Sequence, residues 1–531
     1  MAKAKTPDIG SISAAQLQEV KAQLKEQLPP PLYQRVERLL QTLEYLMGII
    51  EQKSYSIARL KRMLFGHQTE KASKVFPQSK KGADSAKNRP KAKGHGRKGA
   101  KDYPGAKTVA VPHPERQAGQ PCPKCDKGKL YLFKEPARLI RMVAQPIFQA
   151  TCYELQRLRC LLCGALFTAP APAAAGLSKY DPSVGTMLGI MRYGLGLPMY
   201  RMDKWQNYFG IPLPAGTQWQ LVAEASQSPK GVYEELINTA AQGSLVHNDD
   251  TTMWVQELAK EIADSGAEEK KDKRTGIFTT GIVAITGEHQ IALFFTGRKH
   301  AGENLTDLLQ HRSPALGKPL QMCDALSRNE SKTVATTLCN CILHGRRNFV
   351  DLAEKFPQEC AKVIDTLAEV YRVDAQAKQE QLCDDQRLAL HQEHSRPLMD
   401  NLHTWMNEQI DQHKVEPNSG LGGAIAYMTK HWVPLTRFLE VAGAPLDNNI
   451  AERALKMAIL HRKNSLRFKT RRGAKVGDIF MSLIHTCQLN HVNPFQYLMA
   501  LQKNASQVQE HPSRWLPWNY QQASVEVIDT S

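Results

Sequence analysis

The strongest constraint on the fold is the order of strand-like and helix-like segments between Ser244 and Asp324. β-branched and aromatic residues, which favour strands, gather in short runs there, and a polar segment at Glu257–Thr275 interrupts them. The predicted order is three strands, a helix and a fourth strand, at Ser244–Asn248, Ile277–Thr286, Ile291–Thr296, Glu303–His311 and a segment ending at Asp324.

This order is that of an RNase H-like fold. A long section rich in Glu, Gln, Lys and Leu follows from Arg346 to Leu439, and a last helix opens at Asp447-Asn-Asn. The 531 residues also exceed what one hydrophobic core usually holds. We predict a multidomain α/β protein: an RNase H-like core begun at 241–345, a helical insertion at 346–440, core and C-terminal helices at 441–503, and a tail at 504–531.

Three acidic residues occupy positions that could form one site. Asp249 closes the first predicted strand, Asp324 closes the fourth, and Glu452 lies in the first turns of a helix that residues 447–449 can cap. Three carboxylates without His or Cys suit Mg²⁺ or Mn²⁺. Two such ions would serve in-line phosphodiester chemistry. Singly, each acid is better explained as a turn, cap or helix-pairing residue, so their joint order carries the prediction.

The charge balance favours a polyanionic partner. The formal net charge is +17, and the chain has neither a long apolar run nor the apolar centre of a signal peptide near its start. We therefore expect a cytoplasmic protein that binds DNA or RNA and no membrane.

Basic residues supply candidate DNA contacts. Lys456 and Lys463 follow Glu452 by four and eleven residues, so on one helix they share its face to within about 40°. The segment 71–108 is rich in Lys, Arg, Gly, Ser and Pro, and is either a solvated linker or a tail lying along phosphates. The candidates are Arg89, Lys91, Lys93, Arg97, Lys98, Arg346, Arg347, Lys456, Arg462 and Lys463, although some could equally be surface charges.

The N-terminal region, 11–70, carries a seven-residue apolar repeat. Val36, Leu43, Ile50, Ile57 and Leu64 occupy one position, and leucines occupy most of the other. This pattern predicts a leucine zipper and hence a homo-oligomer. The alternative is an amphipathic helix that packs on its own domain.

Two Cys-x-x-Cys pairs predict a zinc ribbon at 109–170. Cys122, Cys125, Cys160 and Cys163 would give the four thiolates that structural Zn²⁺ prefers, with a hairpin of Leu139–Phe148 and Thr151–Arg159 between the pairs. A redox pair is the alternative use. Residues 171–240 look helical and could include a helix-turn-helix, a pattern that any helical domain can show.

The chain resembles the IS66 family of insertion-sequence transposases, in their large catalytic subunit, from about Leu60 to Leu501. The resemblance rests on both cysteine pairs and on blocks of sequence, of which the last is the most specific: His247-Asn-Asp-Asp-Thr251, Leu320-Gln-Met-Cys-Asp324, Cys341-Ile-Leu-His-Gly-Arg-Arg347 and Asp447-Asn-Asn-Ile-Ala-Glu-Arg-Ala-Leu455. It implies that Asp249, Asp324 and Glu452 form an Asp-Asp-Glu triad acting on element ends, and that accessory proteins of the element take part. It also implies a bacterial protein that binds DNA and associates with the nucleoid. Asp249 is preferred to Asp250 by its register with His247, and Thr252 replaces the family's usual proline.

Three functions follow as hypotheses. The first is a DNA transposase that cleaves and joins strands with metal ions. The second is a DNA-binding regulator that keeps the fold without the chemistry, which the intact triad disfavours. The third is a nuclease of the same fold that hydrolyses strands without joining them.

Overall fold

The computed structural model describes residues 178–264 and 274–530 continuously, most of residues 106–176, and short stretches between residues 23 and 40. The apolar repeat beyond Leu40, the basic candidates from Arg89 to Lys98, and both Cys160 and Cys163 lie outside the described residues. The chain divides into two compact units. One comprises Met1–Ser79, Gln242–Asp249 and His300–Glu452, and the other comprises Lys80–Ala241, Asp250–Lys299 and Arg453–Ser531.

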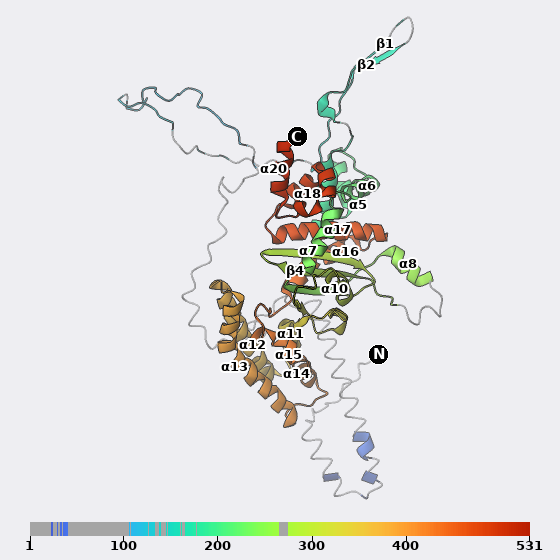
Figure 1. Ribbon diagram of the computed structural model, residues 1–531, viewed down its shortest axis with the longest axis vertical. Helices are drawn as coiled ribbons and strands as arrows, with labels where there is room; N and C mark the ends of the chain where they lie inside the picture. Colours follow the sequence, from blue (N-terminus) through green and yellow to red (C-terminus); the bar gives the residue numbers. More distant parts are fainter. Residues whose placement is uncertain are drawn as a thin grey trace, which may run out of the picture. The chain divides into compact units, whose positions relative to one another are not determined.

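A five-stranded sheet has the strand order β5-β4-β3-β6-β7. Its strand β4 is labelled in Figure 1. Strands β4 and β5 pair antiparallel, whereas β3, β6 and β7 run parallel. The bounds are Leu245–Thr252 for β3, Phe278–Thr286 for β4, His289–Gly297 for β5, Leu320–Cys323 for β6 and Thr337–Asn340 for β7. The prediction of a multidomain α/β fold is confirmed.

Three details of this region differ from the sequence-based expectation. Strand β3 continues through the β-branched pair Thr251 and Thr252, so Asp249 lies within the strand and does not close it. The predicted polar segment begins with a helix, α8 (Gln256–Asp264). Strand β7 was not predicted, because it is only four residues long and its apolar residues do not alternate.

The first unit packs helices against the parallel strands. Buried apolar residues of β6 and β7 form one core with helices of the predicted insertion, including Phe349, Ile364 and Met399. Gly345 permits this packing, because a Cβ there would lie 2.4 Å from the sulfur of Met428. The helices are α10 (Ala301–Leu309), α11 (Ile342–Leu352), α12 (Pro357–Gln379), α13 (Asp384–Asp411), α14 (Gly420–Lys430), α15 (Trp432–Leu435) and the start of α16 (Asn449–Ser465).

In the second unit, one helix covers the edge strand β5. Asp478, Ser482 and Thr486 lie one turn apart on α17 (Arg471–Leu489) and accept hydrogen bonds of 2.9–3.1 Å from alternate backbone amides of β5. They satisfy donors that an exposed edge would leave open to another strand. The unit also contains α8, α16 from Arg453 onward, and the following helices: α4 (Pro182–Gly189), a π-helical turn (Ile190–Gly194), α5 (Met199–Tyr208), α6 (Ala215–Ala225), α7 (Lys230–Ala241), α18 (Pro494–Lys503), α19 (Ala505–Glu510) and α20 (Tyr520–Thr530).

The cysteine-rich region contains a hairpin that the sequence did not predict. Strand β1 (Arg157–Arg159) pairs antiparallel with β2 (Leu166–Thr168), and the second cysteine pair lies between these two strands in the sequence. The apolar alternation at Thr151–Arg159 correctly indicated β1, whereas its predicted partner, Leu139–Phe148, lies mostly outside the described residues. Among the described residues, no helix combines the length and the apolar character needed to cross a bilayer.

Candidate active site

Two of the three predicted acids come together near the carboxyl ends of adjacent parallel strands. The register of β3 and β6 pairs His247 with Met322, and Asp249 and Asp324 each follow two residues further along the chain. The side-chain nitrogen of Asn329 lies 3.4 Å from Oδ1 of Asp249 and 2.6 Å from Oδ1 of Asp324. The two carboxylates therefore converge on one point, at the edge of a parallel sheet where ligands commonly bind.

A buried amide network holds this edge together. The backbone carbonyl of Asn329 accepts hydrogen bonds from the side chains of Asn248, at 2.7 Å, and Gln321, at 2.8 Å. The Gln321 side chain also donates to Oδ1 of Asn248. All three side chains are at most 1% exposed. The loop after β6 is thereby tied to both acid-bearing strands.

The start of α16 is tied to the same edge. Asn448 donates from its side chain to the carbonyl of Asn248 at 3.0 Å, and its Oδ1 lies 3.1 Å from Nδ1 of His247. Its backbone N–H points to the sulfur of Cys341. Asp447 caps the helix by accepting from the backbone N–H of Asn449, one of the predicted caps. Glu452 follows Asn448 by one helical turn.

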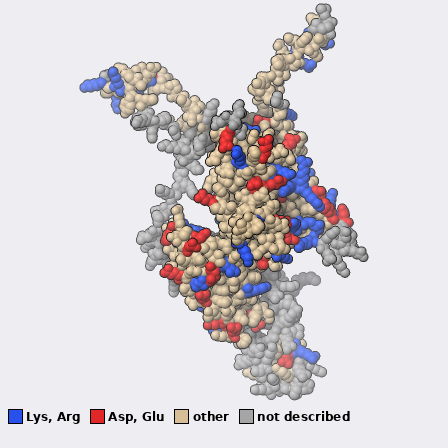
Figure 2. All heavy atoms as spheres, viewed as in Figure 1, with Lys and Arg blue, Asp and Glu red and all other residues tan. Residues whose placement is uncertain are grey.

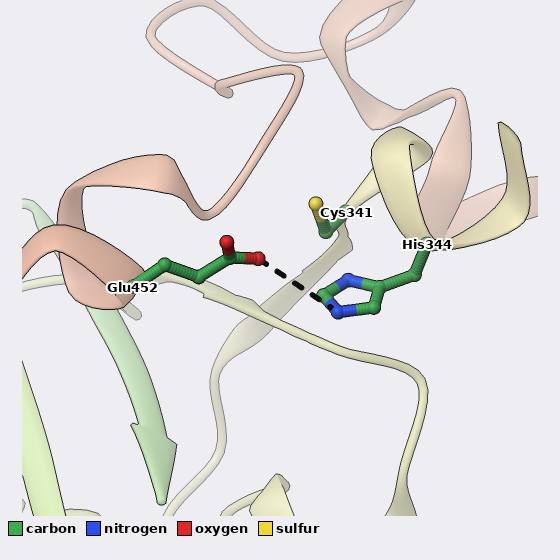
Figure 3. A group of neighbouring side chains, drawn as sticks. All are labelled: Cys341, His344 and Glu452. Atoms are coloured by element: carbon green, nitrogen blue, oxygen red, sulfur yellow. Dashed lines mark ion pairs between the residues drawn. The ribbon is translucent and has the colours of Figure 1, made fainter. Parts of the chain in front are cut away.

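Glu452 lies beside a histidine to which the sequence assigned no firm role. Oε1 of Glu452 lies 3.8 Å from Nε2 of His344, on α11 (Figure 3). Both side chains are about one-third exposed. The other ring nitrogen of His344 is buried and has no hydrogen-bond partner among the described residues. Cys341, His344 and Glu452 offer ligand atoms within 4.8 Å of one another. Figure 3 shows the three side chains as neighbours.

The chemistry of these groups distinguishes two kinds of metal site. Burial raises the pKa of the Cys341 thiol to about 12, which disfavours the thiolate that a soft metal would require. The same sulfur already accepts from Asn448. Asp249 and Asp324 instead present hard oxygen donors to a shared point, which fits Mg²⁺ or Mn²⁺. Glu452 could add a third carboxylate from the neighbouring helix.

The predicted basic residues lie in different environments. Lys456, Lys463 and Arg347 are exposed. Arg346 is buried, with 8% of its surface exposed, so we propose no direct DNA contact for it. Arg462 donates from Nη1 to Oγ1 of Thr252 at 2.6 Å and to Oγ1 of Thr251 at 3.1 Å, and so anchors α16 to the end of β3.

A larger basic surface was missed in the sequence. Residues 453–475 contain nine Lys or Arg residues and no acid, a run that a count of charge along the chain could have found. Figure 2 shows Lys and Arg gathered where the end of α16 and the start of α17 lie beside α8. Arg471 forms an ion pair with Glu261 there. The exposed members are Arg453, Lys456, Lys463, Arg467, Lys469, Arg471, Arg472 and Lys475, which we call the basic surface.

The first cysteine pair forms a tight turn. The backbone N–H of Cys122 donates to the carbonyl of Gly128 at 2.7 Å. Hydrogen bonds from the backbone of Lys127 and Gly128 and from the Cys122 side chain lower the pKa of the Cys125 thiol. A lowered pKa favours the thiolate that zinc binds.

Comparisons with known proteins identify similar sequences. The family model described as "Transposase IS66 family" matches residues 178–476. The uncharacterized protein y4jD of Sinorhizobium fredii is 24% identical over 524 residues, covering 92% of this chain and 98% of that protein. The uncharacterized protein y4hP of the same organism is 25% identical over 397 residues, covering 70% of this chain and 68% of that protein.

Proposed function

Because the chain belongs to the IS66 family of transposases, we propose that it binds the ends of an insertion sequence and catalyses metal-dependent DNA strand cleavage and strand transfer. The observation that carries this proposal is the convergence of Asp249 and Asp324 on one point between adjacent parallel strands. The strand order β5-β4-β3-β6-β7, with three parallel strands beside an antiparallel pair, supports an RNase H-like core.

Asp249, Asp324 and Glu452 would hold two Mg²⁺ or Mn²⁺ ions. Bound ions would activate a water or DNA 3′-hydroxyl and stabilise the leaving oxygen in an in-line displacement. The protein's own part is positioning. The buried amide network fixes the two strand ends, Asn448 fixes the start of α16, and His344 restrains the carboxylate of Glu452. Such restraint matters because misplaced reacting groups lose much of their rate advantage.

The basic surface would bind the DNA backbone. Its lysines and arginines, with Arg347 and the predicted basic segment of residues 71–108, can neutralise phosphates without reading base sequence. Arg471 is partly neutralised by its ion pair with Glu261, so the other members contribute more of the positive potential.

The N-terminal regions would serve assembly and end binding. We propose that Cys122, Cys125, Cys160 and Cys163 bind one structural Zn²⁺. The hairpin around the second pair and the lowered pKa of Cys125 both support a zinc ribbon. The apolar repeat from Val36 to Leu64 would form a zipper that joins copies of the chain. We also propose that accessory proteins of the same element take part in transposition.

Labelled duplexes carrying the element's ends test the proposed function. Incubation with Mg²⁺ or Mn²⁺ should produce cleavage and joining by the wild type, and both should fall by at least about a thousandfold in Asp249→Asn, Asp324→Asn and Glu452→Gln. Asp250→Asn is the matched control, because this acid is adjacent to Asp249 but has no proposed role. DNA binding without cleavage would support a regulator, and cleavage without joining would support a nuclease.

A further inference from the structure

The amide of Asn329 occupies the place where the two acids converge. Its Nδ2 contacts one oxygen of Asp249 and one of Asp324. These contacts are 3.4 Å and 2.6 Å long, so the two carboxylate oxygens lie close to each other. Carboxylates this close repel each other when both are ionised. The partly positive amide N–H groups offset that repulsion, as a bound cation would to a much greater extent.

The other atom of the same amide lacks a hydrogen bond. The side chain of Asn329 is completely buried, and its Oδ1 has no hydrogen-bond partner among the described residues. Buried polar atoms in this state are uncommon and call for an explanation. A half-turn about the terminal torsion exchanges Oδ1 and Nδ2. Either orientation leaves one amide atom without a hydrogen bond. The presence or absence of a cation between the two carboxylates therefore decides whether Oδ1 or Nδ2 faces them.

We propose that Asn329 is a residue of the metal site that responds to its occupancy. Without a cation, Nδ2 faces Asp249 and Asp324 and holds them together. With Mg²⁺ or Mn²⁺ bound, the amide turns and Oδ1 becomes an additional oxygen ligand. This inference rests on the proposed function, because it requires a cation site at the two acids.

The fold holds the backbone of Asn329 in place while leaving this torsion free. Asn248 and Gln321 bind its carbonyl and not its side chain. Gly302 on α10 lets the loop approach, because a Cβ there would lie 2.2 Å from the carbonyl oxygen of Glu330 and 2.8 Å from that of Arg328. The side-chain amide can therefore turn without displacement of the loop.

Mn²⁺ binding to the full chain without DNA, measured by titration calorimetry, tests the inference. Asn329→Leu removes both the donor and the oxygen, and should weaken Mn²⁺ binding about tenfold to a hundredfold. Asn329→Asp removes the donor but keeps an oxygen, so it should bind Mn²⁺ at least as tightly as the wild type. Its melting temperature should fall without metal, because a third carboxylate is added, and should recover with Mn²⁺.

Asn340→Leu is the matched control. Asn340 is also a buried asparagine with an unpaired Oδ1, but its amide lies near the backbone carbonyl of Asp324 and not its carboxylate. Its substitution should lower stability and leave Mn²⁺ affinity unchanged. Equal weakening in Asn329→Leu and Asn329→Asp would show that only the donor matters, and unchanged affinity in Asn329→Leu would show that Asn329 is no ligand; either result overturns the inference.

The Asp324→Asn variant separates the two proposals. If the wild type binds Mn²⁺ and Asp324→Asn does not, the proposed metal site stands whatever the Asn329 variants do. If the wild type and Asp324→Asn bind Mn²⁺ equally, the metal site itself is wrong, and the inference about Asn329 falls with it.

Discussion

The side chain of Asn448 donates a hydrogen bond to the backbone carbonyl of Asn248, the residue before Asp249. The bond joins a helix and a strand that lie 200 residues apart in sequence. Because Glu452 follows Asn448 by one turn, the same bond relates the third acid to the first. The asparagine pair that opens the last helix therefore does more than cap it.

Asn448→Ala should destabilise the fold. The change removes the Asn448 side chain as a partner of the buried carbonyl of Asn248 and of Nδ1 of His247, at a cost of about 1–3 kcal/mol for each group left unsatisfied. Urea denaturation measures the loss of stability. Asn449→Ala, at the next position, should cost less than about 0.5 kcal/mol. Equal destabilisation in the two variants would contradict the anchoring role.

His344→Leu should slow DNA cleavage about tenfold to a hundredfold, because Glu452 loses the group that restrains its carboxylate. His344→Gln retains an N–H donor near the position of Nε2 and should recover part of the rate. Single-turnover cleavage of end duplexes measures both variants. A role confined to packing predicts no advantage of Gln over Leu.

Gly302→Ala should disturb the metal site from a distance. The new methyl group meets the carbonyls of Arg328 and Glu330 and pushes the loop that carries Asn329 away from the two acids. We expect a loss of stability of about 1–3 kcal/mol and weaker Mn²⁺ binding. Gly317→Ala is the control, because nothing lies within 4 Å of a Cβ there. Calorimetry that shows equal Mn²⁺ affinity in both variants would exclude this coupling.

Asp478 should make stability depend on pH. Burial raises the pKa of this carboxyl to about 7, against hydrogen bonds donated by Thr296. The folded chain therefore holds the proton more tightly than the unfolded chain, and stability falls as pH rises from about 4 to about 7, by up to about 4 kcal/mol. Asp478→Asn should flatten this profile in urea melts, whereas Glu288→Gln, in an exposed turn, should not.

The basic surface should control the salt dependence of DNA binding. Arg467→Ala and Arg472→Ala should each reduce the slope of log affinity against log salt by about 0.9 for every phosphate that the variant no longer neutralises. Fluorescence anisotropy with random-sequence duplexes measures this slope. Arg514→Ala removes an exposed arginine that is paired with Glu526 on the last helix, so it should leave the slope unchanged.

The sequence by itself determined the features that depend on local pattern. β-branched runs indicated β4 and β5, and the helical periodicity and cap at Asp447 indicated α16, because these elements form from residues close together in the chain. The sequence also predicted that Asp324 directly follows β6 and that Asp249 belongs to the region of β3. It did not predict that β3 continues beyond Asp249. The family resemblance, confirmed by the match over residues 178–476, identified the acids that deserve testing.

Only the tertiary structure decided which distant groups meet. Asn329 meets both acids because the loop after β6 folds back under Gly302, and His344 meets Glu452 because β7 places α11 beside the start of α16. The pairing of β1 with β2 and the covering of β5 by α17 depend on interactions of the same kind. Local sequence preferences do not predict such interactions, because each is stabilised by burial and hydrogen bonds that exist only once separate segments have packed together.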